Sequence, residues 1–136
     1  MRPYQKAALC IPVLLLVVGI SLLGCGKQPG VQKTPGPSVP NTTVQLAQTS
    51  FVQSTRSIKA GDSLLFDDTV DGGGLHIICL GKDMTCDKTA TGPSALTGEG
   101  FTINPGGTKS ITFPTAGTYD ITCSVHPNMN LVVTVS

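Results

Sequence analysis

Hydrophobic residues from position 43 to the C-terminus occur in short runs, and Gly, Pro, Asn and Asp separate these runs. No helical periodicity is sustained in this stretch, so the pattern favours β-strands. The expected strands are 43–47, 57–60, 63–66, 75–80, 108–113, 118–123 and 131–135. Several short strands at this spacing predict one all-β domain, built as an antiparallel sandwich or barrel.

Alternation within these strands predicts which side chains face the core. Along 119–123 the odd-numbered residues are Tyr, Ile and Cys, whereas the even-numbered residues are Asp and Thr. Successive side chains point to opposite faces of a strand, so Cys123 is expected to be buried at the end of its strand. His76 shares a face with the apolar residues two and four positions later, and we expect it to be buried as well.

The aromatic residues of this stretch are expected to pack in the core. Tyr119 is expected either to anchor the core or to act as a corner tyrosine that bonds to nearby backbone; a role as an electron relay is the alternative. The phenylalanines with an expected core position are Phe51, Phe66, Phe101 and Phe113.

The N-terminal residues 1–24 have the pattern of a secretory signal. Two basic residues precede the run 7–23, which is almost wholly apolar and has 17 residues, fewer than the roughly 20 of a membrane span. The sequence Leu-Leu-Gly-Cys at 22–25 resembles the lipobox of bacterial lipoproteins. This resemblance implies cleavage before Cys25, a diacylglyceryl group on its sulfur, and attachment to the extracytoplasmic face of the cell membrane. An uncleaved anchor and ordinary secretory cleavage are the alternatives.

Residues 25–42 are expected to be the lipidated cysteine followed by a linker. The stretch 26–40 contains four prolines and no acidic residue, and it cannot bury enough apolar surface to offset the entropy of ordering it. We expect a tether with a reach of up to about 50 Å; a proline-rich ligand for a partner domain is the alternative. The folded domain is then 43–136.

The charge of the folded part argues against nucleic-acid binding. From residue 41 onward there are five Lys and Arg against eight Asp and Glu, a net charge of −3. A nucleic-acid-binding surface requires a basic stripe or a stacking platform, and the sequence contains neither.

The candidate chemistry lies in Cys123, His126 and Met129, which have the spacing C-x2-H-x2-M. A thiolate, an imidazole and a thioether suit copper better than zinc, calcium or magnesium. A blue-copper centre needs a second imidazole, and His76 is the only other histidine of the chain. Pro127 restricts the backbone of the loop and removes a donor, so it stiffens the ligand loop.

Other interpretations of these residues are weaker. A single buried histidine or methionine usually serves packing, but the four ligand residues together favour a metal. Zinc makes little use of a thioether. A nucleophilic pair of Cys123 and His126 needs an exposed, activated thiolate, whereas Cys123 is expected to face inward. We therefore expect neither catalysis nor a small-molecule substrate.

The chain has five cysteines: Cys10, Cys25, Cys79, Cys86 and Cys123. Cys10 is expected to be lost with the signal, and Cys25 is expected to carry the lipid. If the last binds metal, Cys79 and Cys86 remain as a pair, and such a pair is expected to be oxidised outside the cytoplasm. The bridge is worth about 2–3 kcal/mol. The alternative is a second thiol site, in which these two cysteines and Met84 bind Cu(I).

The stretch 117–129, Gly-Thr-Tyr-Asp-Ile-Thr-Cys-Ser-Val-His-Pro-Asn-Met, resembles the last strand and ligand loop of the cupredoxins, the plastocyanin and amicyanin family of blue-copper proteins. The resemblance covers 43–136, and it implies a Greek-key β-sandwich with one type 1 copper ion at one end. The implied ligands are His76, Cys123 and His126, with Met129 as the axial ligand. The family often has asparagine after the first histidine, where this chain has Ile77.

The resemblance also implies a function. Together with the expected lipid anchor, it implies a membrane-tethered carrier that transfers one electron at a time by Cu(II)/Cu(I) cycling, with electrons entering or leaving through the edge at His126. Its partners are then redox proteins of a membrane electron-transfer chain. The alternative is a copper storage or delivery protein outside the cytoplasm that uses the same ligands.

Overall fold

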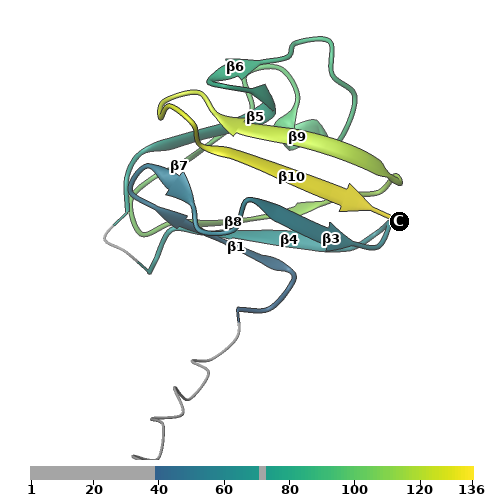
Figure 1. Ribbon diagram of the computed structural model, residues 1–136, viewed down its shortest axis with the longest axis horizontal. Helices are drawn as coiled ribbons and strands as arrows, with labels where there is room; N and C mark the ends of the chain where they lie inside the picture. Colours follow the sequence, from purple (N-terminus) through teal and green to yellow (C-terminus); the bar gives the residue numbers. More distant parts are fainter. Residues whose placement is uncertain (1–38, 71–72) are drawn as a thin grey trace, which may run out of the picture. The chain divides into compact units, whose positions relative to one another are not determined.

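Two β-sheets pack face to face in the computed structural model, which describes residues 39–70 and 73–136 (Figure 1). In chain order, the elements are β1 (Thr43–Ala47), β2 (Ser50–Phe51), β3 (Thr55–Ile58), β4 (Ser63–Asp67), β5 (His76–Lys82), β6 (Thr85–Cys86), the 3-10 helix η1 (Ser94–Leu96), β7 (Phe101–Ile103), β8 (Thr108–Thr112), β9 (Gly117–Cys123) and β10 (Asn130–Val135). One sheet has the order β2-β1-β4-β8; the other has the order β3-β10-β9-β5-β6, with β7 also paired to β5. Within the described residues, no helix has the length and apolarity that a membrane crossing requires.

The predicted all-β sandwich is confirmed, and all seven expected strands are present. Their ends shift by at most two residues from the expected positions. The expected signal 1–24 and the lipidated Cys25 lie outside the described residues, as does the linker up to residue 38.

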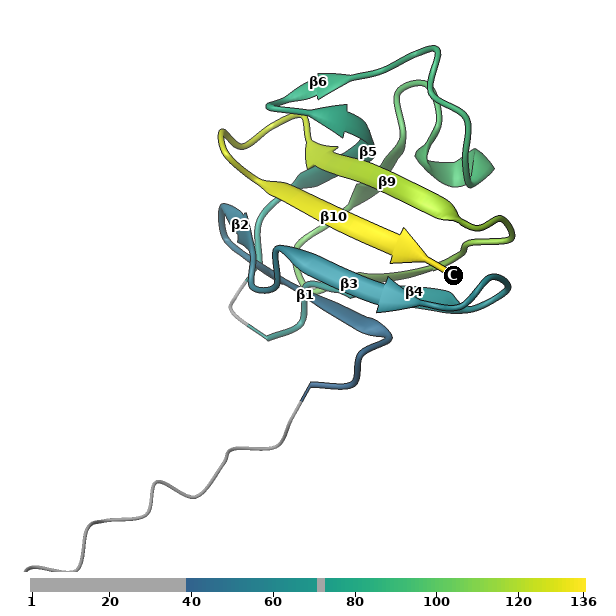
Figure 2. The ribbon, with the colours of Figure 1, turned by 45° about the vertical axis from the view of Figure 1, so that its right-hand side comes forward.

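The expected antiparallel pairing holds for most neighbouring strands, but two pairs depart from it. β1 pairs with β4 in parallel, and β10 pairs with β3 in parallel. The chain leaves β1, passes through β3 in the other sheet, and returns to add β4 in the direction of β1 (Figure 2). A parallel pair needs such a crossover, and hydrophobic alternation does not report it.

The core lies between the two sheets and contains the side chains expected there. Phe66 and Phe113 are fully buried and Phe51 is nearly so, while Phe101 is partly buried against them. Phe66 contacts both Phe51 and Phe101 edge to face, with ring centroids 6.3 and 5.6 Å apart. Tyr119 packs against Phe113 and donates a hydrogen bond from its hydroxyl to the Thr115 carbonyl at 2.8 Å, so it is a corner tyrosine.

One position departs from the alternation in β9. Asp120 is exposed as expected, but Thr122 is fully buried. The hairpin of β5 and β6 folds over the outer face of the sheet at this point, and the Met84 backbone N–H donates to the Thr122 hydroxyl oxygen at 3.1 Å. The outward face of β9 is therefore covered next to Cys123.

Replacing Tyr119 with Phe should lower the free energy of unfolding by about 0.5–1.5 kcal/mol, because it removes the hydrogen bond to Thr115 and keeps the ring. Denaturant unfolding measures the change. The exposed Ser110→Ala in β8 is the control, and it should shift stability by less than about 0.5 kcal/mol. Equal stability of Tyr119→Phe and wild type would contradict a stabilising role for the hydrogen bond from Tyr119 to Thr115.

Candidate metal centre

The four expected ligands come from two places in one sheet. His76 is the first residue of β5, Cys123 is the last residue of β9, and His126 and Met129 lie in the loop to β10. β5 and β9 are antiparallel neighbours, with Ile78 opposite Cys123. The start of one strand therefore lies beside the end of the other, and this brings His76 to the ligand loop.

Three of the ligand side chains meet at one point. The Cys123 Sγ atom lies 3.8 Å from Nδ1 of His76 and 3.7 Å from Nδ1 of His126. The donor atoms of these three residues all lie within 4.8 Å of one another. Metal–nitrogen bonds of about 2.0 Å and metal–sulfur bonds of about 2.3 Å, set at about 120°, separate nitrogen from sulfur by about 3.7 Å. The triad therefore has the dimensions of a trigonal metal site.

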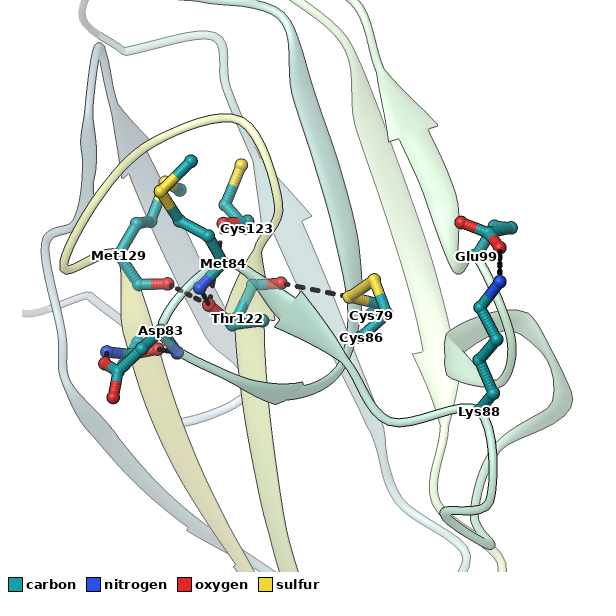
Figure 3. The surroundings of a disulfide bond; sticks show 10 residues. Cys79, Asp83, Met84, Cys86, Lys88, Glu99, Thr122, Cys123 and Met129 are labelled. Carbon is teal, nitrogen blue, oxygen red and sulfur yellow. Dashed lines mark hydrogen bonds and ion pairs between the residues drawn. A yellow bond between two sulfur atoms is a disulfide. The ribbon is translucent and has the colours of Figure 1, made fainter.

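Met129 is fully buried at the end of the same loop. Its carbonyl oxygen accepts a hydrogen bond from the Cys123 backbone N–H at 3.0 Å, so the two residues face each other across the hairpin. Figure 3 shows their side chains extending in the same direction from the end of the hairpin. The thioether is thus on the side of the thiol, where the axial ligand was expected.

Backbone hydrogen bonds hold the ligand loop in place. The Ser124 N–H donates to the Ile77 carbonyl at 2.9 Å, which ties the loop to β5 directly beside His76. Asn128 has a left-handed backbone, with a φ of 61°, a conformation that asparagine tolerates better than most residues. At position 77 this chain has isoleucine, so the bond between position 77 and the ligand loop is made by the backbone carbonyl.

The electrostatics of His76 favour the neutral ring. Burial lowers the pKa of His76, and nearby His126 lowers it further, while the Asp68 carboxylate opposes both. A neutral imidazole has a free lone pair, as a metal ligand requires. The Nε2 atom of His76 lies 3.5 Å from the Asp68 Oδ1 atom, and both side chains are fully buried. His126 is only half-buried.

Cys79 and Cys86 form a disulfide that joins β5 to β6. With both thiols in the bridge, the alternative Cu(I) site of these cysteines with Met84 is absent from the described part of the chain. Cys123 is the free cysteine there, and it is buried. In Figure 3 the bridge lies beside Thr122, whose carbonyl oxygen is 3.9 Å from the Cys79 sulfur.

The bridged hairpin supports the ligand loop from outside. Asp83 and Asn130 exchange two hydrogen bonds: the Asp83 N–H donates to the Asn130 side chain at 3.0 Å, and the Asn130 amide donates back at 2.7 Å. The buried Thr122 hydroxyl accepts from Met84 and donates to the Met129 carbonyl at 3.2 Å. The bridged hairpin thus contacts β9 and β10 where the ligand loop leaves each of them.

Sequence reasoning missed two residues that act next to the ligands, Asp68 and Thr122. Both are polar and fully buried. Asp68 follows another aspartate at the end of a strand, and Thr122 occupies the polar phase of an alternation. Each pattern is typical of exposed positions. The sequence alone therefore contains no signal that these two polar residues are buried.

The donor set decides which metal fits. One thiolate, two imidazoles and a buried thioether at one end of a two-sheet sandwich define a type 1 copper protein. The sequence model for copper binding proteins of the plastocyanin/azurin family matches residues 39–136. The chain belongs to this family. The arrangement of His76, Cys123, His126 and Met129 fits one type 1 copper ion, which these side chains would hold.

Solved structures of amicyanin share this fold. A mutant of amicyanin in its reduced state has a TM-score of 0.53 at 21% identity, and the match covers 74% of this chain and 87% of that chain. A different amicyanin mutant, in the Cu(I) form, has a TM-score of 0.52 at 22% identity, with 69% and 80% covered. Amicyanin from Paracoccus versutus has a TM-score of 0.50 at 22% identity, with 76% and 86% covered. No curated protein matches the chain.

Replacing Cys123 with Ser should abolish the intense visible band that Cu(II) gives with a bound thiolate. The change removes the sulfur that faces both imidazoles and leaves the other ligands in place. Absorption and paramagnetic resonance spectra after addition of Cu(II) measure the effect. Ser124→Ala, one residue further on, is the matched control and should keep the band.

Proposed function

We propose that this protein is a one-electron carrier that works through a type 1 copper centre and does not transform a substrate. The observation that carries the proposal is the buried Cys123 Sγ with one imidazole Nδ1 on each side, at 3.7 and 3.8 Å. Copper supplies one-electron chemistry when it is bound by these side chains, because both Cu(II) and Cu(I) accept this ligand set.

The surroundings of the ligands support a carrier because they restrict movement. A site that keeps its geometry when its charge changes needs ligands that are fixed by packing and by hydrogen bonds behind them. The Cys123 N–H donates to the Met129 carbonyl at 3.0 Å, and the Ser124 N–H donates to the Ile77 carbonyl at 2.9 Å. The Thr122 hydroxyl adds a bond to the Met129 carbonyl.

Close packing beside the histidines favours electron transfer over copper storage or delivery, which needs ligands that open to exchange the metal. A Cβ atom at Gly74 would lie 3.0 Å from the Gln48 carbonyl oxygen. It would also lie 3.6 Å from both His76 Nε2 and His126 Cε1. A single methyl group would therefore fill the space between Gly74 and both imidazoles.

The edge at His126 is the proposed route for electrons. His76, Cys123 and Met129 are fully buried, whereas His126 is half-buried. Its neighbours Val125 and Pro127 are exposed, and the exposed fraction of Val125 is 38%. Exposed apolar residues next to the half-buried ligand suit brief contacts with redox partner proteins of a membrane electron-transfer chain.

We further propose that the protein is attached to the extracytoplasmic face of the cell membrane through Cys25. The lipobox at 22–25 and the proline-rich stretch that follows it support this location. Two acyl chains give stable attachment where a single chain is marginal. β1 begins at Thr43, so the linker allows the copper domain to reach partners away from the lipid.

Val125→Asp should slow electron self-exchange by about tenfold, because two copies that meet at this edge then bring like charges together. The visible band should remain. Line broadening in NMR spectra of mixed oxidised and reduced protein measures the exchange. Ser110→Asp adds the same charge on the other sheet and serves as the control. A colourless protein that binds only Cu(I) and passes it to a chelator would support storage or delivery instead.

Cys25→Ser should move the protein from the membrane fraction to the soluble fraction, because it removes the proposed attachment sulfur. Fractionation of cells that express the full chain, followed by immunoblotting, measures the distribution. Cys10→Ser changes a cysteine inside the expected signal and should leave the protein with the membrane. The lipid proposal fails if both variants stay with the membrane.

A further inference from the structure

Asp68 is a carboxylate with no access to solvent. It follows β4, its backbone N–H donates to the Gly107 carbonyl at 3.0 Å, and its side chain is 0% exposed. Its neighbour Asp67 has a conventional turn role and accepts hydrogen bonds from the Thr69 N–H at 3.0 Å and hydroxyl at 2.6 Å. The two adjacent aspartates therefore face different surroundings.

Burying a carboxylate without a partner is costly, so its nearest polar neighbour matters. Among the described residues, neither oxygen of Asp68 has a hydrogen-bond partner, and the same is true of His76 Nε2. These unpartnered atoms face each other, with Oδ1 3.5 Å from Nε2. That separation is at the outer limit of a hydrogen bond. A small movement of the Asp68 carboxylate toward the ring breaks no other hydrogen bond of that carboxylate within the described residues.

The proton position on His76 follows from the ligand geometry. Its Nδ1 atom faces the Cys123 sulfur, so a metal ligated at Nδ1 leaves the ring proton on Nε2. Nε2–H is then a donor directed at the Asp68 carboxylate. Ligating histidines generally donate their second ring N–H to a carboxylate, a carbonyl or water, and this fixes their orientation.

The backbone closes over the carboxylate. A Cβ atom at Gly73 would lie 2.3 Å from Asp68 Oδ2 and 2.9 Å from its Cγ atom. Gly73 also has a positive φ of 53°, which glycine adopts without strain. The residues around Asp68 thus leave room for the carboxylate but not for a side chain above it.

We propose that Asp68 is a positioning residue of the copper centre: its carboxylate accepts the Nε2–H of His76, fixes the ring, and lowers the reduction potential. The potential falls because a buried negative charge behind a ligand stabilises the more positively charged, oxidised form of the centre more than the reduced form. The proposal rests on the copper centre described above, and it is independent of the membrane attachment.

Asp68→Asn tests the charge separately from the shape. The amide has the size of the carboxylate and still offers an oxygen to Nε2–H, but it has no charge. We expect the visible band to remain and the equilibrium constant for reduction to rise on the order of tenfold. A redox titration of the copper-loaded protein measures this constant. Asp67→Asn, with the same charge change one residue away in the turn, is the control and should change it less than about twofold.

The wild-type protein provides a second measurement that needs no variant. In the Cu(I) form, the Nε2–H proton of His76 should be visible by NMR, protected from exchange with solvent, and coupled across the hydrogen bond to the Asp68 carboxyl carbon. A proton that exchanges rapidly overturns the proposal, as does an Asp68→Asn shift no larger than that of Asp67→Asn. Absence of the visible band in wild type would instead refute the copper centre itself.

Discussion

Antiparallel pairing between β5 and β9 sets Ile78 opposite Cys123, and this register fixes where the metal ligands meet. His76 begins one strand and Cys123 ends the other, so the pair forms only when the two strands are aligned in this way. A slip by one residue would turn the side chains of one strand to the opposite face. The apolar side chains of both strands prevent such a slip, because they would lose their places in the core between the sheets.

The interior of the domain contains few polar side chains, and they gather at the metal centre. Within the described residues, the buried polar or charged side chains are Asp68, His76 and Thr122. One is a ligand, one faces the second nitrogen of that ligand, and one supports the carbonyl of the axial methionine. Burying polar groups has a cost that a purely structural sandwich would avoid. Their placement shows that the fold tolerates this cost at one end, where it orders the ligands.

Much of the site could be predicted from the sequence because the ligands are close together in it. Three of them lie between Cys123 and Met129, and the chain contains one other histidine. The strands were predictable for a similar reason, since alternation within a single short strand reports a buried face. What alternation cannot report is the segment that covers the opposite face. Thr122 was expected to be exposed, but a hairpin from a distant part of the chain buries it.

The same limit applies to contacts between distant segments. The parallel pairs β1–β4 and β3–β10 depend on how the chain crosses between sheets, and no local pattern encodes that path. Asp68 and Asp67 are identical in type and adjacent in sequence, yet one is fully buried against a ligand and the other is bonded within a turn. Only the folded chain distinguishes them.

The disulfide between Cys79 and Cys86 makes part of the copper centre depend on the chemistry of the surrounding compartment. It closes the hairpin whose backbone bonds to Thr122, and Thr122 in turn bonds to the Met129 carbonyl. A disulfide of this kind persists only where the surroundings are oxidising. In a reducing compartment the axial side of the centre would lose its outer support, while Cys123, His76 and His126 would keep theirs. The final ligand geometry would then depend on oxidation of these two cysteines as well as on the binding of the metal.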